Sequence, residues 1–534
     1  MAAADNNRES IGAFDYVIVG AGSAGCVLAN RLSANPNTRV CLLEAGGPDK
    51  DPLIHAPMGF AFMPPWAASN WKFDTAPQKH LNNRICYQPR GRVLGGSSSI
   101  NAMIYIRGSR HDYDRWAAAG ASGWSWDDVL PYFKKAENNE RGEDRYHSTG
   151  GPLNVADLRY KNPLSDVFLN AAAELQLPAN SDFNSAEQDG VGFYQVTQKD
   201  GRRCSAARAY LEPIANRSNL HIETGARAER VRFDGKRAVG VDFQQGRAKK
   251  SAGASAEVIL SGGAFQSPQL LQLSGIGDGA HLRANDIDVV VDLPAVGQNL
   301  QDHLDWTAIH KAKTDESIGL NFGFAKSLPS AIGAYRNDGE GPITSNLAEC
   351  GGFVKTDPSE PEPDVQLHFL PAMVDDHGRK RHLGSGFSCH VCVLRPKSRG
   401  SVTLASPDPM ATPVIDPNFL SDEDDLRRLM KGARIVERIF SAPSFKDVIG
   451  ERLYSEPGCD DAALVEHIRA HADTIYHPVG TCAIGTIVDP HLQVKGVQGL
   501  RVADASVMPL LVSGNTNAPS IMIGEKASDL VLAG

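Results

Sequence analysis

The chain has 534 residues, of which 42% are hydrophobic and 22% are charged, and its formal net charge at pH 7 is -9. This content is enough for a large core and for more than one domain. The acidic balance provides no basic field for a polyanion, so nucleic acid is excluded as the main partner and a small molecule is the expected ligand.

Targeting signals and structural disulfides are not indicated. Residues Met1 to Ala13 are small and polar, without the basic start and apolar stretch of a signal peptide or a membrane span. The nine cysteines are odd in number and lack the spacing of a disulfide framework. A cytoplasmic location is predicted, with peripheral attachment to the inner face of the membrane left open.

The segment Phe14–Glu44 has the pattern of one strand-helix-strand unit. The apolar run Tyr16–Val19 predicts a strand, the spacing of apolar residues in Cys26–Leu32 predicts a helix, and Val40–Leu43 predicts a second strand. The unit is therefore of the α/β class.

A glycine-rich turn, GAGSAG, directly follows the first predicted strand. Gly20 permits the tight turn, Gly22 lets backbone N–H groups approach a pyrophosphate, and Gly25 allows close packing of helix and strand. The turn opens the predicted helix, so the N-terminus of that helix meets the negative charge. Glu44 lies 24 positions after Gly20, where it is placed to accept hydrogen bonds from a ribose diol. NAD and FAD share the adenosine diphosphate half that this turn would bind, so the turn alone does not decide between the two cofactors.

The next part of the chain alternates between irregular and regular patterns. Pro52–Gln88 is rich in Pro, Trp, His and Asn, which predicts loops packed on a cofactor or forming a lid. Helices are expected at Asp112–Ala117 and Trp126–Ala136. A further strand, Glu257–Leu260, is followed by a helical pattern at Ser267–Gln272.

Between about residues 311 and 464 the composition changes to strand-like runs separated by Pro- and Asp-rich turns. Val365–Phe369 and Ser401–Leu404 are examples. We expect a second, mainly antiparallel layer here.

One cysteine pair has the spacing of a metal site. Cys389 and Cys392 match a zinc knuckle, but no second pair with metal spacing follows. Because Gly386–Leu394 alternates and is rich in β-branched and aromatic residues, a strand with the two thiols on opposite faces is favoured, and no metal is predicted.

Four long motifs resemble those of the glucose-methanol-choline (GMC) oxidoreductase family. The resemblance runs from residue 14 to the end and is greatest to the bacterial branch of choline, aliphatic-alcohol and polyethylene-glycol dehydrogenases. It implies an α/β FAD-binding (Rossmann-like) domain and a second α+β substrate domain built on an antiparallel sheet. The motifs are Gly91–Asn101, Gly263–Gly277, Gly297–His303, and Gly499–Pro509 followed by Asn515–Ile523.

The resemblance also implies discontinuous domains and a set of cofactor contacts. The FAD-binding domain would comprise residues 14–155, 215–310 and 465–534, and the substrate-binding domain residues 156–214 and 311–464. The contacts implied at the adenosine diphosphate are Gly20, Gly22, Ser23, Gly25, Glu44 and Ala228. Those implied along the isoalloxazine and ribityl groups are Trp71, Val93, Asn101, Ala102, Met103, Ile104, Asp504 and Ala505.

One departure from the family concerns how FAD is held. Some members attach FAD covalently through a histidine in the Gly-Gly-x-Ser-Ser segment, and the matching residue here is Ile100. Because an isoleucine has no nucleophilic nitrogen, we predict non-covalent FAD.

The resemblance assigns the chemistry to two residues. His477 matches the family's catalytic histidine, and its ordinary pKa of about 6.5 suits a base that removes a hydroxyl proton. Asn517 is matched to the second member, whose amide donates a hydrogen bond to the alcohol oxygen while hydride passes to flavin N5. Pro519 predicts a helix from this point through Leu532, its N-terminus directed at the pyrimidine end of the flavin. His303 is interpreted as structural.

The predicted function is FAD-dependent oxidation of a primary alcohol, aliphatic or aromatic, with electrons passed to a quinone-like acceptor. An oxidase that uses O2 and releases H2O2 is an alternative, as is a hydroxynitrile-lyase-type enzyme on the same fold. Glu349 resembles a position facing the cation of choline in choline-specific relatives, although a structural, hydrogen-bonded carboxylate is favoured. The alcohol, the acceptor and the oligomeric state are left open.

Overall fold

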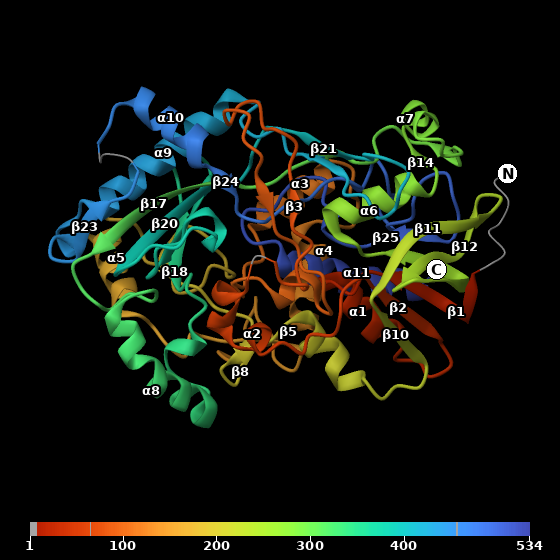
Figure 1. Cartoon of the computed structure of the whole chain (residues 1–534), viewed down its shortest axis with the longest axis horizontal. Coiled ribbons are helices and arrows are strands. Elements are labelled where there is room, and N and C mark those ends of the chain that lie inside the picture. Colours follow the sequence, from red (N-terminus) through yellow and green to blue (C-terminus); the bar gives the residue numbers. More distant parts are fainter. Residues whose placement is uncertain (1–7, 65, 455–457, 534) are drawn as a thin grey trace.

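The structure is a computed structural model that describes residues 8–64, 66–454 and 458–533. Residues 1–7 of the polar segment considered above lie outside the described part. Two seven-stranded sheets dominate the fold and lie toward opposite ends of the molecule in Figure 1, with β1, β2 and β10 at one end and β17, β18 and β20 at the other.

The first sheet is mainly parallel at its centre. Its strands follow the order β10-β2-β1-β13-β12-β11, with β25 beside β13. The predicted strands Tyr16–Val19, Val40–Leu43 and Glu257–Leu260 are confirmed, because these apolar runs are buried in the centre of the sheet. The strand bounds are β1 Glu9–Val19, β2 Val40–Glu44, β10 Leu220–Thr224, β11 Ala226–Asp234, β12 Arg237–Gln245, β13 Ala248–Leu260 and β25 Leu500–Val502.

The two ends of the chain meet on this sheet. Helix α1 (Ser23–Leu32) packs along α11 (Asn517–Ala533), and β25 pairs in parallel with β13. Arg31 Nη2 contacts the buried Glu525 carboxylate at 2.7 Å, and this ion pair joins the two helices. The helix predicted from Pro519 is confirmed, with the proline in its first turn.

The second sheet is antiparallel throughout, in the order β23-β17-β20-β19-β18-β7 with β24 beside β17. The strand at Val365–Phe369 is confirmed, and so is the strand carrying Cys389 and Cys392, which lie three residues apart and therefore on opposite faces. No group of residues in the described ranges could hold a metal ion. The bounds are β7 Gly190–Phe193, β17 Leu304–Ala312, β18 Cys350–Val354, β19 Val365–Leu370, β20 Gly386–Val393, β23 Ile449–Arg452 and β24 Asp473–Thr474.

Two features of the 311–464 region differ from the expected run of strands. Of the predicted strand Ser401–Leu404, the first three residues lie in β21, which ends at Thr403 and belongs to a separate three-stranded sheet. The region also contains long helices, of which α9 is buried at positions such as Leu429, Ala433 and Val436, a helical spacing that the overall alternation concealed. The domain division remains a prediction; β17 belongs to the second sheet although it begins at residue 304.

The other elements connect these layers. The helices predicted near Asp112 and Trp126 are confirmed as α3 and α4, and Pro52–Gln88 is largely irregular as expected. In the described ranges no helix combines the length and apolar character needed to cross a bilayer. The remaining helices are α2 Pro52–His55, α3 Arg110–Ala118, α4 Trp126–Ala136, α5 Pro163–Glu174, α6 Gly263–Leu273, α7 Gly279–Ala284, α8 Phe322–Asp338, α9 Glu423–Phe440 and α10 Asp461–His471. The remaining strands are β3 Phe73–Asp74, β4 Tyr87–Gln88, β5 Glu137–Asn139, β6 Leu153–Val155, β8 Gln198–Lys199, β9 Arg202–Arg203, β14 Ile276–Gly277, β15 Val291–Asp292, β16 Gln298–Leu300, β21 Gly400–Thr403 and β22 Val414–Asp416.

Candidate active site

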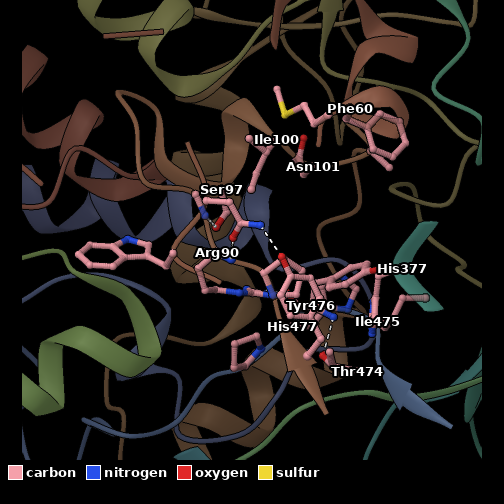
Figure 2. Close-up of a pocket in the computed structure, with 18 of the residues that line it drawn as sticks. Phe60, Arg90, Ser97, Ile100, Asn101, His377, Thr474, Ile475, Tyr476 and His477 are labelled. Atoms are coloured by element: carbon pink, nitrogen blue, oxygen red, sulfur yellow. Dashed lines mark hydrogen bonds between the residues drawn. The ribbon is translucent and has the colours of Figure 1, made fainter. Parts of the chain in front are cut away.

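A large cavity of about 770 Å³ is lined by residues of both seven-stranded sheets. The first sheet contributes the ends of β1, β2, β11 and β13, and the second contributes β17, β19 and β20. Figure 2 shows Phe60, Ile100 and Asn101 on one side of the pocket and Thr474, Tyr476 and His477 on the other. The cavity therefore places the glycine-rich turn and the predicted catalytic histidine in one space.

The glycine-rich turn has the geometry of a pyrophosphate cradle. Gly20 has a φ of 99°, and a Cβ there would lie 2.4 Å from the carbonyl oxygen of Ser261. A Cβ on Gly25 would lie 1.9 Å from the carbonyl oxygen of Gly20. A Cβ on Gly22 would meet nothing closer than 3.9 Å, and Gly22 lines the cavity, so this glycine leaves room for a ligand rather than for packing.

Glu44 lies at the end of β2 and lines the same cavity. Its carboxylate accepts hydrogen bonds from the backbone N–H groups of Ala21, at 2.9 Å, and Gly46, at 2.7 Å. Burial raises the pKa of Glu44 to about 7, against the lowering effect of these two bonds. Because each carboxylate oxygen retains acceptor capacity, Glu44 is suited to bind a ribose diol.

The Gly91–Asn101 motif packs directly on the glycine-rich turn. The Gly95 N–H donates to the Ala21 carbonyl at 2.8 Å, and a Cβ on Gly96 would lie 2.7 Å from the Gly22 Cα. Ile100 and Asn101 line the cavity, and the Asn101 Oδ1 accepts from the buried Arg203 at 2.7 Å. The two motifs thus form one continuous wall.

Most of the predicted cofactor residues line the cavity, and two do not. Gly25 lies inside α1 against Gly20, and the buried Val93 forms a bridge with Gly47. The predicted residues that line the cavity are Gly20, Gly22, Ser23, Glu44, Trp71, Asn101, Ala102, Met103, Ile104, Ala228, Asp504 and Ala505.

His477 is only 7% exposed and is held from three sides. Its Nδ1 lies 2.9 Å from the Nδ1 of His303, and its Nε2 lies 3.2 Å from the Nδ2 of Asn515. Its backbone N–H donates to Asp302 at 2.9 Å. Burial lowers the pKa of His477 well below its ordinary value of 6.5, and the nearby His303 adds to the effect. The ring is therefore neutral in the resting structure.

The predicted pairing of His477 with Asn517 remains a prediction: both residues line the cavity, but a second asparagine contacts the His477 ring. The amide beside His477 belongs to Asn515, two residues earlier, whereas the Oδ1 of Asn517 accepts from the Ser23 hydroxyl at 2.7 Å. Asn517 begins helix α11, and α11 packs on α1, so its side chain faces the start of α1. The motif contains both asparagines, and only the helix start distinguishes them.

The structure also bears on two residues for which the sequence favoured a structural role. Glu349 is fully buried and accepts from the Ser345 and Ser165 hydroxyls and the Asn162 N–H, and it is not among the residues lining the cavity. This supports a structural carboxylate. His303, in contrast, directly contacts His477.

Several polar residues of the cavity were not found from the sequence. Arg90 donates to the backbone carbonyl of Tyr476 at 2.8 Å, and burial lowers its pKa to about 10. Asp305 contacts His390 at 2.6 Å, and burial lowers the pKa of the nearby His368 to about 3. Arg90 directly precedes one of the recognised motifs and Asp305 follows another by two residues, which is the signal that could have indicated them.

Comparisons with known proteins place these features in a family. Family models described as GMC oxidoreductase match residues 14–305 and 396–524. An alcohol dehydrogenase (acceptor) of Pseudomonas putida is 50% identical over 97% of this chain and 96% of its own length. The mitochondrial choline dehydrogenase of Homo sapiens is 44% identical over 99% of this chain and 91% of its own. The structure of a formate oxidase of Aspergillus oryzae, studied for modification of its FAD, is similar with a TM-score of 0.90 at 27% identity, and covers 98% of both chains.

Proposed function

The chain belongs to the GMC oxidoreductase family, whose members bind FAD, and from this premise we propose that it oxidises a primary alcohol, aliphatic or aromatic, to the aldehyde. The observation that carries the proposal is the neutral, buried His477 beside Asn515, in the same cavity as the glycine-rich turn. An alcohol dehydrogenase among the similar proteins supports this reaction class.

The residues present fit FAD. Gly22 and the start of α1 would hold the pyrophosphate, and Glu44 the adenosine ribose. Asn101 to Ile104, Asp504 and Ala505 would line the flavin end. When bound, the flavin supplies the hydride acceptor at N5. Because Ile100 offers only carbon atoms to the cavity, we propose non-covalent binding, and acid precipitation should then release free FAD into the supernatant.

The protein's own part in the reaction is proton transfer and alignment. His477 accepts the hydroxyl proton at Nε2, the ring nitrogen on the side of Asn515. The Asn515 amide donates a hydrogen bond to the alcohol oxygen as negative charge develops there. Burial keeps the His477 ring neutral in the resting enzyme, so that it is competent as a base at neutral pH.

The experiment that tests this function uses the FAD-loaded enzyme and a panel of primary alcohols with an artificial dye acceptor. Anaerobic mixing with a good alcohol should bleach the flavin absorbance, whereas no bleaching with any alcohol would favour the hydroxynitrile-lyase-type alternative. His477→Ala should abolish most turnover while FAD stays bound. Turnover unchanged by that substitution contradicts the role of His477.

For the electron acceptor we propose a quinone-like carrier, with the enzyme at a membrane surface. Phe322 and Leu383 are 79% and 81% exposed, and Leu383 forms a bridge with Leu320, which lines the cavity. Phe322 begins α8, which projects from the body of the molecule in Figure 1. The neighbouring Lys380 and Arg381 provide positive charge for anionic headgroups. Such a face would give a lipid-soluble carrier access to the cavity.

This acceptor proposal is tested with vesicles of anionic phospholipid and a membrane quinone. The enzyme should sediment with the vesicles, and Phe322→Ser with Leu383→Ser should reduce that binding, whereas Val414→Ser, at an exposed residue of β22, should not. Stoichiometric H2O2 formation with a good alcohol, and no quinone reduction, would instead support the oxidase alternative.

A further inference from the structure

We infer that Asp302 and His303, the last two residues of the Gly297–His303 motif, position His477, and that His303 fixes its ring tautomer so that the lone pair lies on Nε2. This rests on the proposed role of His477 as base. The proposed alcohol oxidation assigns no role to the Gly297–His303 motif.

The ring contact between the two histidines permits only one arrangement of protons. The two Nδ1 atoms are 2.9 Å apart, so one must donate and the other accept. The Nε2 of His303 lies 2.9 Å from the backbone carbonyl oxygen of Leu394, which can only accept. His303 therefore carries its proton on Nε2, and burial, which lowers its pKa to about 4, keeps it neutral. Its Nδ1 accepts from His477.

A second contact leads to the same tautomer independently. The Asn515 Nδ2, a donor, lies 3.2 Å from the Nε2 of His477, which must then accept. The orientation of the amide is set by Gln366, whose Nε2 donates to the Asn515 Oδ1 at 3.2 Å. Both ring nitrogens of His477 are thus assigned from opposite sides.

Asp302 holds the backbone of the same residue. One carboxylate oxygen accepts from the His477 N–H at 2.9 Å, and the other accepts from the Thr474 hydroxyl at 2.5 Å. The preceding residue, Tyr476, has a φ of 77°, an unfavourable value for a non-glycine residue. An anchored N–H on His477 stabilises that conformation. Strand β17 begins immediately after the motif, at Leu304, so both holding groups are fixed to the second sheet.

The arrangement has a direct consequence for the proton step. The O–H bond of the alcohol breaks, its proton forms a bond to Nε2, and the hydride leaves the carbon with its electron pair for the flavin. The ring is then positively charged with both nitrogens protonated. His303, which remains neutral, continues to accept from Nδ1 and stabilises that charge. With the opposite tautomer, the nitrogen facing the alcohol would already carry a proton and could not accept another.

The test uses two substitutions that each keep one of the two nitrogen positions of His303. In asparagine the acceptor oxygen Oδ1 is attached to Cγ, as Nδ1 is in histidine. His303→Asn should therefore retain the hydrogen bond to His477, and its kcat/KM should stay within about fivefold of the parent value. Glutamine reaches only the Nε2 position, so His303→Gln should lose about tenfold to a hundredfold, mainly in kcat. His111→Gln, at an exposed histidine of α3, is the control and should change neither parameter.

A direct measurement separates this positioning role from general damage. In the resting holoenzyme labelled with ¹⁵N-histidine, ring shifts assigned with His477→Gln should place the His477 proton on Nδ1 and the lone pair on Nε2. Finding the proton on Nε2 would overturn the inference even if a variant fails to fold. So would a folded His303→Gln enzyme with parental kcat. Anaerobic reduction of the parent flavin by alcohol tests the proposed function separately, since the tautomer is measured without substrate.

Discussion

Exchanging Asn515 and Asn517 separately for alanine distinguishes a group that acts on the reacting oxygen from one that joins two helices. The Asn515 Nδ2 lies 3.2 Å from the Nε2 of His477 and the residue lines the cavity, so its amide is within reach of any hydroxyl bound to that ring. Asn517 also lines the cavity, but its amide oxygen is 2.7 Å from the Ser23 hydroxyl.

The expected losses in the rate of flavin reduction differ by about two orders of magnitude between the two variants. Removal of one donor aimed at developing oxyanion charge costs about 10²–10³ in kcat, so Asn515→Ala should reduce flavin reduction by that factor. Asn517→Ala removes one neutral hydrogen bond, which is worth about 0.5–1.5 kcal/mol. It should lower the unfolding temperature or FAD retention slightly and change kcat less than tenfold.

Stopped-flow reduction of the FAD-loaded enzymes by a saturating alcohol measures the step itself, with FAD content and thermal unfolding followed in parallel. Both variants should bind FAD. If Asn517→Ala slowed flavin reduction as much as Asn515→Ala, or more, the assignment of the amide donor to Asn515 would be wrong.

Three further predictions follow from the glycine-rich turn, Glu44 and His477. Gly25→Ala should yield little folded protein because its Cβ would lie 1.9 Å from a backbone oxygen. Gly22→Ala should fold, but it should bind FAD more weakly in a fluorescence titration. Equal yields of the two variants would contradict the assignment of Gly25 to packing and of Gly22 to ligand binding. Burial raises the pKa of Glu44 to about 7, so its carboxylate becomes protonated as the pH falls through 7, and the affinity for FAD should fall from pH 8 to pH 6. Glu44→Gln should weaken FAD binding about tenfold or more and remove this pH dependence. If the variant kept the same pH dependence, Glu44 would be excluded as its origin. The pKa of His477 is lowered, so the base is lost only well below pH 6.5, and kcat/KM should stay level down to that pH; an acid limb centred above 6.5 is incompatible with a neutral buried base.

The nucleotide-binding half was predictable because its signals are local. Helix α1, strand β2 and the turn between β1 and α1 each follow from apolar spacing and glycine positions within about thirty residues. The helices of the 311–464 region were not predicted. In α9, for example, apolar residues recur at every third or fourth position among charged ones, and the strand-like alternation of the surrounding segment concealed this helical spacing.

The active-site details depended on contacts across long sequence distances. His303 and His477 are 174 positions apart, and no local pattern joins them. Asn515 and Asn517 belong to one motif and have the same chemistry; the resemblance assigned the amide donor to Asn517, and the contact of Asn515 with the His477 ring appears only in the folded structure. The role of His303, at the end of a recognised motif, depends on its contact with His477, which the motif itself does not reveal.

The joining of the two chain ends on the first sheet has a consequence for biosynthesis. Helix α1 meets its packing partner, helix α11, only after the long intervening stretch of chain has been made, and at about 5–20 residues per second that interval is roughly 25 to 100 s. During this interval the face of α1 that packs on α11 lacks its final neighbour and is a candidate for chaperone protection. Capture of the yellow cofactor is then a late event in maturation, and the colour of the purified protein becomes a readout of whether the final helix has docked.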